Sequence, residues 1–67
     1  METIGQRLRR LRKGRKMTLK MVGILAGIEL TLICRYEKDL HKPNTDNLAR
    51  LAGCLGVSMD YLYKGAE

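Results

Sequence analysis

The side chains in this chain that could do chemistry are mainly cations, and most of them lie in its first third. The 67 residues carry a formal net charge of +6, and Glu2 is the only acidic residue among residues 1–20. Positive charge concentrated on one element suits binding to a polyanion, although a solvated helix face would have the same composition. The basic side chains of this segment are Arg7, Arg9, Arg10, Arg12, Lys13, Arg15, Lys16 and Lys20.

Groups for catalysis or metal binding are scarce in the sequence. Ser58 is the only serine, and it has no histidine near it in the sequence, since His41 is the only one. Cys34 and Cys54 are too few for a disulfide scaffold, and with one distant His they lack the spacing of a zinc site. We therefore expect no enzymatic activity, no metal and no cofactor, with both thiols reduced in the cytoplasm.

The length allows one domain with a small core, which we place over residues 1–67. A chain of this size buries only about 60% of its unfolded surface. Phe and Trp are absent, which argues against stacking platforms for single-stranded nucleic acid and against a membrane-surface helix. The least polar stretch, residues 21–34, is interrupted by Glu29 and is shorter than the ~18–20 residues of a membrane span. We expect no contact with a membrane.

Two short helices joined by a tight turn are the most informative element. Thr18 is a good N-cap for the first of them, and Gly27 is the natural left-handed residue after it. The second should cover about residues 30–38, beginning after Glu29. This arrangement predicts a helix-turn-helix over about residues 18–38, a motif that places its second helix in the major groove of DNA. The side chains expected to face the core are Val22, Leu25, Ala26, Ile33 and Tyr36.

Three further helices complete the predicted all-α, five-helix bundle. Apolar residues at helical spacing predict a first helix over about residues 3–13. Asn44 or Thr45 should cap a fourth helix, and Ser58 a short fifth one. The last two helices could pack on the core or form a dimerisation hairpin. The apolar stripes of the three helices are Ile4, Leu8 and Leu11; Leu48, Leu51, Ala52 and Leu55; and Met59 and Leu62.

The predicted third helix is followed by an unusual residue for a helix end. Asp39 stands where Gly or Asn would be expected, and Asp tolerates the left-handed conformation moderately well. Pro43 then fixes an extended segment before the fourth helix.

Taken in order, these segments resemble the lambda-repressor-like, or Cro-type, phage-repressor family of helix-turn-helix domains. The similar segments are IGQRLRRLR, MT, AGI, ICRYEK, Pro43 and NLARLAGCLGVSMDYL. The resemblance implies sequence-specific binding of double-stranded DNA by a transcriptional regulator, a repressor acting as a homodimer on a palindromic operator. It also implies a bacterial or phage-encoded protein that is associated with the nucleoid in the cytoplasm.

The resemblance implies a structural ion pair between Arg12 of the first helix and Glu37 at the end of the third. A partly buried pair would lock the first helix across the motif, and removing one partner would cost ~3–5 kcal/mol. An exposed pair would contribute less than about 1 kcal/mol. We expect the buried arrangement.

The resemblance assigns base reading to the first residues of the third helix and to one residue a turn later. Arg35 is the clearest reader, because a guanidinium can donate two hydrogen bonds to guanine, worth ~1–3 kcal/mol of discrimination. A phosphate contact is the alternative for Arg35. Cys34 is either a passive small side chain or a redox or alkylation switch. The expected base-contact residues are Leu30, Thr31, Leu32, Cys34 and Arg35.

Phosphate contacts are expected from residues near the second helix and after the third. Each neutralised phosphate steepens the logarithmic salt dependence by roughly 0.9, and such contacts position the protein without choosing the sequence. Leu19 stands where the family usually has Gln, but its backbone N–H at a helix N-terminus can still bind a phosphate. The expected phosphate-contact residues are Arg9, Arg15, Leu19, Lys20, Lys38, His41 and Lys42.

Several leucines and an isoleucine depart from the family's pattern by placing apolar side chains on a surface that is normally polar. Leucine cannot form a hydrogen bond with a base and can only pack against thymine methyl groups. Exposed apolar patches often mark partner sites. The alternative function is therefore a protein-interaction module that keeps the fold and binds an antitoxin or antirepressor partner. The residues concerned are Leu19, Ile24, Leu30 and Leu32.

Overall fold

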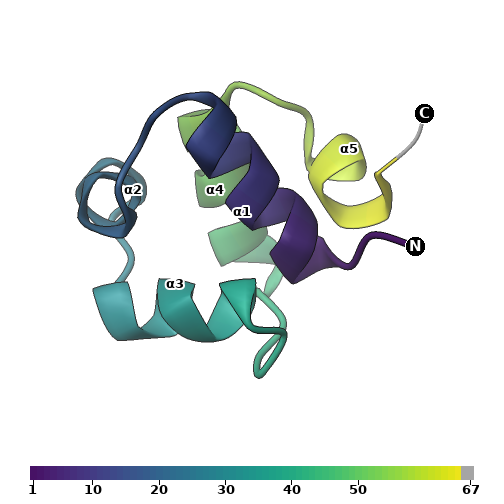
Figure 1. Ribbon diagram of the computed structural model, residues 1–67, viewed down its shortest axis with the longest axis horizontal. Coiled ribbons are helices and arrows are strands. Elements are labelled where there is room, and N and C mark those ends of the chain that lie inside the picture. Colours follow the sequence, from purple (N-terminus) through teal and green to yellow (C-terminus); the bar gives the residue numbers. More distant parts are fainter. Residues whose placement is uncertain (66–67) are drawn as a thin grey trace.

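Five helices account for most of residues 1–65, which are the residues that the computed structural model describes (Figure 1). The predicted all-α class and five-helix count are confirmed for this part of the chain. None of these helices is long and apolar enough to cross a membrane. The elements are α1 (Ile4–Gly14), α2 (Leu19–Ala26), α3 (Leu30–Glu37), α4 (Thr45–Leu55) and α5 (Met59–Lys64).

Four of the five helices begin at a polar side chain that accepts a hydrogen bond from the backbone three residues later. Thr3 caps α1, where we had expected it inside the helix, and Thr18 caps α2 as predicted. Asn44 caps α4 and Ser58 caps α5. Helix α3 follows Glu29, whose side chain makes no capping bond. The start of α3 therefore depends on tertiary packing more than on its own cap.

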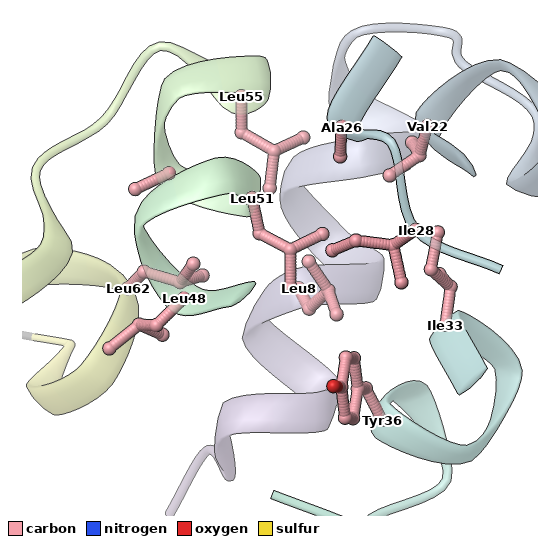
Figure 2. Packing of buried hydrophobic residues seen from close by; sticks show 11 residues of the cluster. Leu8, Val22, Ala26, Ile28, Ile33, Tyr36, Leu48, Leu51, Leu55 and Leu62 are labelled. Atoms are coloured by element: carbon pink, nitrogen blue, oxygen red, sulfur yellow. The ribbon is translucent and has the colours of Figure 1, made fainter. Parts of the chain in front are cut away.

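One apolar core is shared by all five helices (Figure 2). Its fully buried side chains are contributed by every helix, and they are Leu8, Val22, Ile33, Leu51, Leu55 and Leu62. Tyr36 is also buried, and its hydroxyl accepts a hydrogen bond from Asn47 Nδ2 at 2.8 Å. That bond joins α3 to α4 and satisfies a polar atom that would otherwise be costly to bury.

The predicted inward position of Leu25 is wrong, because its side chain is 66% exposed. Helix α2 packs instead through Val22, Gly23 and Ala26. A Cβ atom on Gly23 would lie 3.0 Å from the carbonyl oxygen of Ile28, so this glycine allows the turn to pass close to the helix. Ile28 itself is buried. This close approach turns the Gly23 face inward and leaves Leu25 in solvent.

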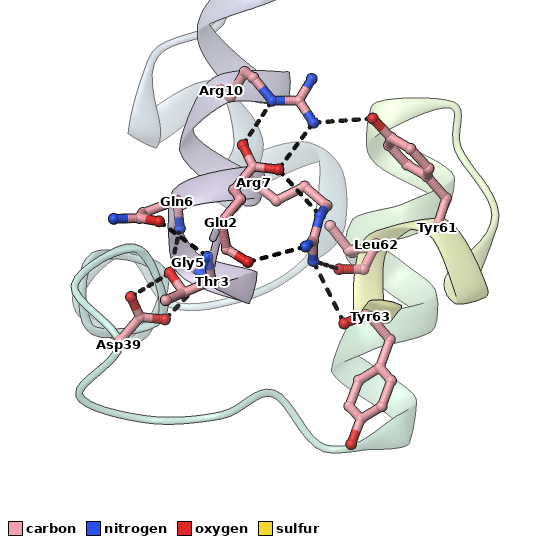
Figure 3. A network of polar contacts seen from close by, with 10 residues as sticks. All are labelled: Glu2, Thr3, Gly5, Gln6, Arg7, Arg10, Asp39, Tyr61, Leu62 and Tyr63. Atoms are coloured by element: carbon pink, nitrogen blue, oxygen red, sulfur yellow. Dashed lines mark hydrogen bonds and ion pairs between the residues drawn. The ribbon is translucent and has the colours of Figure 1, made fainter. Parts of the chain in front are cut away.

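Arg7 belongs to the basic segment that suits a polyanion, but the structure buries it and leaves only 5% of the residue exposed. Its Nη1 donates to the carbonyl oxygen of Leu62 at 2.9 Å, and its Nη2 donates to that of Glu2 at 3.2 Å (Figure 3). A cation is favourable beside the last carbonyls of a helix. Arg7 therefore fastens α5 to α1 and is unavailable to a polyanion.

Glu2 completes this attachment of the N-terminus to α5. Its carboxylate accepts from Arg10 Nε at 2.7 Å and lies 3.2 Å from Arg7 Nε, while Arg10 also donates to the Tyr61 hydroxyl at 2.9 Å (Figure 3). The hydrogen bond from Arg10, helped by the charges of both arginines, holds the pKa of Glu2 below its ordinary value.

Glu2→Gln should lower the stability of the protein at pH 7 and make that stability less sensitive to acid. Because the pKa of Glu2 is lowered by folding, its contribution is complete above its unfolded pKa of about 4.3 and is lost as the pH falls through its lowered folded value. Urea unfolding of both proteins between pH 7 and pH 2 measures this. The difference should be largest at neutral pH and shrink in acid, and a pH-independent difference would contradict the role of this charge.

Gly5 marks the point where α1 meets the end of α3, a contact that the sequence did not reveal. A Cβ atom there would overlap the carbonyl oxygen of Tyr36 and lie 2.8 Å from that of Glu37. Both atoms belong to the backbone, so neither can swing away as a flexible side chain would. The absence of a side chain at Gly5 thus sets how closely the two helices approach.

Gly5→Ala should destabilise the protein by about 1–3 kcal/mol, the usual cost of overpacking a tight contact. Gly53→Ala is the matched control, because a Cβ there meets no atom within 4 Å and Ala is the better helix former by up to about 1 kcal/mol. Urea unfolding of the two variants should therefore give shifts of opposite sign. Equal changes in the free energy of unfolding for the two variants would contradict a tight contact between α1 and α3 at Gly5.

Candidate nucleic-acid interface

Helix α3 lies at the edge of the molecule, along the bottom of the view in Figure 1. Ile33 and Tyr36 fix its inner face in the core, so its outer face is turned to solvent. Thr31 and Arg35 are exposed there, and Leu30 at the start of the helix is 45% exposed. Thr31 and Arg35 are one helical turn apart and share this outer face, whereas Leu30 is accessible at its edge because it begins the helix.

The other two predicted base-contact residues are less accessible. Cys34 is half-buried. Leu32 is also half-buried, and it packs against the apolar core rather than standing free on the outer face. Its place is a consequence of helical geometry, because Leu32 is four residues before the buried Tyr36 and lies on the same side of the helix.

A shallow groove of about 200 Å³ runs beside α3 and joins residues from three helices. Arg9 comes from α1, Leu19 from the first turn of α2, and Lys38 from the end of α3. The first backbone N–H groups of a helix have no partner within the helix, and they favour an anion. This groove combines two exposed cations, Arg9 and Lys38, with such a helix start. Its lining residues are Arg9, Arg12, Leu19, Cys34, Glu37 and Lys38.

The ion pair at the base of this groove is bidentate and buried. Arg12 Nε donates to Glu37 Oε2 at 2.6 Å, and Arg12 Nη2 donates to Glu37 Oε1 at 3.0 Å. The side chains are only 10% and 8% exposed. The hydrogen bonds to Glu37 raise the pKa of Arg12. The remaining nitrogen, Nη1, donates to the carbonyl oxygen of Met17 at 2.9 Å. Arg12 thus holds the end of α3 and the turn before α2 together.

The remaining predicted phosphate-contact residues are spread over the surface. Lys20 is exposed on α2. His41 and Lys42 are exposed after α3 and line a different groove, of about 410 Å³, which they share with Tyr63 and Lys64. The Arg15 guanidinium lies against Gly56 at the C-terminus of α4. The structure therefore does not bring Arg15 into the groove beside α3.

The exposed apolar residues differ in part from those expected. Ile24 is 70% exposed and Leu30 is 45% exposed, but Leu19 is half-buried and packs against the core, as Leu32 does. Leu25 and Met21 instead add apolar area to the outer face of α2. Three of the exposed large apolar side chains are thus on α2, and Leu30 is the one on α3.

Groups that could bind a metal or carry out nucleophilic chemistry do not converge in the described part of the chain. Residues 1–65 contain no group of three or more His, Cys, Asp or Glu side chains that could hold a metal ion. Cys54 is half-buried, and burial raises the pKa of its thiol. A thiol with a raised pKa is a poor nucleophile.

Glu37→Gln should destabilise the protein by about 3–5 kcal/mol, because it leaves the buried Arg12 charge without its partner. Asp46→Asn is the control, since the Arg50–Asp46 pair has side chains that are 49% and 75% exposed and should contribute less than about 1 kcal/mol. Urea unfolding at pH 7 gives both values. A loss below about 1 kcal/mol for Glu37→Gln would contradict a buried lock.

Comparison with known proteins gives consistent matches over almost the whole chain. The family described as helix-turn-helix domain matches residues 5–67. Repressor protein C2 of Salmonella phage P22 is 34% identical over 96% of this chain and 30% of its own length. The immunity repressor protein of Bacillus phage phi105 is 32% identical over 85% of this chain and 40% of its own length. The HTH-type transcriptional regulator YobD of Bacillus subtilis is 40% identical over 85% of this chain and 51% of its own length. The chain thus spans only part of each of these relatives.

Solved structures agree with the sequence matches. The P22 c2 repressor in complex with a synthetic operator superposes with a TM-score of 0.94 at 33% identity, covering 98% of this chain and 100% of that one. SinR, the master regulator for biofilm formation, solved in complex with DNA, superposes with a TM-score of 0.85 at 28% identity, covering 90% and 97%. The five helices described above are therefore arranged as in the P22 c2 repressor and in SinR.

Proposed function

The chain belongs to this family of helix-turn-helix domains, and we propose that residues 1–67 act as one DNA-binding domain of a transcriptional repressor. In this proposal it binds a palindromic operator as a homodimer, in the cytoplasm of a bacterium and associated with its nucleoid. One observation carries the proposal: α3 presents Thr31 and Arg35 on a free outer face while the buried Arg12–Glu37 pair holds its end. The P22 and phi105 repressors support it as relatives.

Reading of bases is assigned to the outer face of α3. The Arg35 guanidinium can donate two parallel hydrogen bonds to O6 and N7 of guanine. Thr31 can contact a base edge or a thymine methyl group, and Leu30 can pack against another thymine methyl. Cys34 lies at the side of the helix nearer to the groove, where it has a smaller part in this contact. We expect a site that contains guanine and thymine at the positions facing α3.

Contacts with the phosphates are assigned to two groups of residues, one in the groove beside α3 and one in the segment after it. Arg9, Lys38 and the backbone N–H groups at Leu19 line one groove and can hold one stretch of DNA backbone. Lys20 can extend this contact along α2. His41 and Lys42, after α3, can contact a second stretch. These residues set the register of the protein on the duplex and leave the choice of sequence to α3.

Two-fold pairing is compatible with the size of the molecule. Recognition helices of a dimer lie about one turn of DNA apart, ~34 Å. The Cα atoms span 28 × 23 × 21 Å, so two copies lying side by side can place their α3 helices at that distance. A bound dimer would then repress transcription by denying polymerase access to the same DNA.

The alternative, a protein-interaction module for an antitoxin or antirepressor, is not favoured. The similar proteins are repressors and regulators, and two of the similar structures are complexes with DNA. Of the four apolar residues that suggested this alternative, only Ile24 and Leu30 are exposed. Leu19 and Leu32 serve the core instead.

Selection of duplexes from a random DNA pool should recover a two-fold-symmetric site. Arg35→Ala should then lose about 1–3 kcal/mol of discrimination at one base pair in each half-site, because the bidentate contact to guanine is absent. Affinities measured for the selected duplex and for single-base variants of it test this.

Lys38→Ala is the matched control for Arg35→Ala. It should weaken binding to all duplexes alike and reduce the logarithmic salt slope by about 1. Wild-type binding that ignores sequence and disappears as salt rises would contradict the proposed function, since it would reflect only attraction of the backbone to a basic surface.

A further inference from the structure

Asp39 occupies a backbone conformation that suits glycine better. It follows the last turn of α3 with φ +59°, in the left-handed region where a side chain crowds the backbone. Glycine would adopt this conformation without that cost. A reason for aspartate at this position must therefore be sought in what its carboxylate does.

The Asp39 carboxylate caps the beginning of α1. Its Oδ2 accepts a hydrogen bond from Thr3 Oγ1 at 2.6 Å, and its Oδ1 accepts one from the backbone N–H of Gly5 at 3.0 Å (Figure 3). The first N–H groups of a helix lack partners within the helix, and a negative charge is favourable there. The connection after α3 thus supplies an anion to the N-terminus of α1.

The same residue is joined to the last turn of α3 through its backbone. The Asp39 N–H donates to the carbonyl oxygen of Tyr36 at 3.1 Å, and the following N–H, of Leu40, donates to that of Arg35 at 2.9 Å. Arg35 is the proposed guanine reader. A displacement of Asp39 would therefore also displace the last turn of α3, which carries Arg35.

Asp39 and Arg12 give α3 two points of attachment to α1. Gly5 and Arg12 are seven residues apart, which is about 10 Å along a helix. Arg12 holds the end of α3 at one of these points, and Asp39 holds the segment after it at the other. Burial of Ile33 and Tyr36 holds the inner face of α3, and these two attachments add restraints on the direction of its end.

We propose that Asp39 is a positioning residue for DNA reading, which sets the direction of α3 by capping α1. This inference rests on the proposed function. Asp39 need not touch DNA itself. Its carboxylate, being negative, would repel the phosphates, so a role through charge and a role through position predict opposite effects of removing it.

Two substitutions separate these roles. Asp39→Gly removes both hydrogen bonds to α1. Because glycine suits the left-handed conformation, the variant should remain folded. Asp39→Asn removes only the charge, because Asn also tolerates this conformation and its amide can still bond with Thr3 and Gly5. Urea unfolding at the temperature of the binding assay confirms that each variant is fully folded.

Binding of each variant is measured on the selected duplex and on a scrambled duplex, over a range of salt. Asp39→Gly should bind the selected duplex about tenfold more weakly, within the range of coupling between neighbouring groups of one network. Its binding to the scrambled duplex and its salt slope should stay unchanged, and Asp39→Asn should keep nearly the wild-type preference.

Three results would overturn the inference. Asp39→Gly could match the wild type on the selected duplex, both variants could bind all DNA more tightly, or Asp39→Gly could weaken both duplexes equally. If the wild-type protein prefers its selected duplex, any of these results refutes the role of Asp39 and leaves the proposed function standing. A wild-type protein without sequence preference refutes the proposed function and this role with it.

Discussion

The buried guanidinium of Arg12 is the interaction on which the arrangement of the helix-turn-helix depends. Its three hydrogen bonds reach Glu37 at the end of α3 and the Met17 carbonyl before α2. Burying two charges is costly, and only good geometry with all polar atoms satisfied offsets that cost. Because both partners are required, the pair permits one relative placement of α1, α2 and α3 and penalises the others.

Helix α3 needs this external support because it is weak by itself. It has eight residues and no side-chain cap, and isolated helices of that length are marginal in water. Ile33 and Tyr36 hold its inner face by burial, while Arg12 and Asp39 hold its end by polar contacts. The outer face of α3 is then not needed for packing against the core. A helix fixed on one side and free on the other is what reading the major groove requires.

The periodicity of the sequence was enough to predict the five helices, the turn at Gly27 and most of the core. It could not fix the rotation of α2, whose sequence LKMVGILA is apolar on nearly every side, so Leu25 was placed inward. The burial of Arg7 and the link from Asp39 to α1 were also missed. Both depend on backbone carbonyl or N–H groups that lie far away along the chain, and such groups leave no pattern in side-chain types.

The residues on the outer face of α3 were predictable from the sequence, whereas the residues around that helix were less so. The positions of Thr31 and Arg35 follow from the helix phase that Ile33 and Tyr36 set. Resemblance to the repressor family supplied the Arg12–Glu37 pair, which no local signal indicates. Arg15 was assigned to the phosphates by its charge and its place near the second helix, and the structure places its guanidinium against Gly56 after α4, outside the groove beside α3.

The most direct test of the central claim, that α3 reads DNA while its end is held by the core, is an NMR titration of the isotope-labelled protein with its selected duplex. The account predicts that amide signals change along the outer face of α3, at Thr31 and Arg35, and in the first turn of α2. The signals of Leu25 on the outer face of α2 should stay constant. Changes confined to that outer face, with α3 unaffected, would contradict the account.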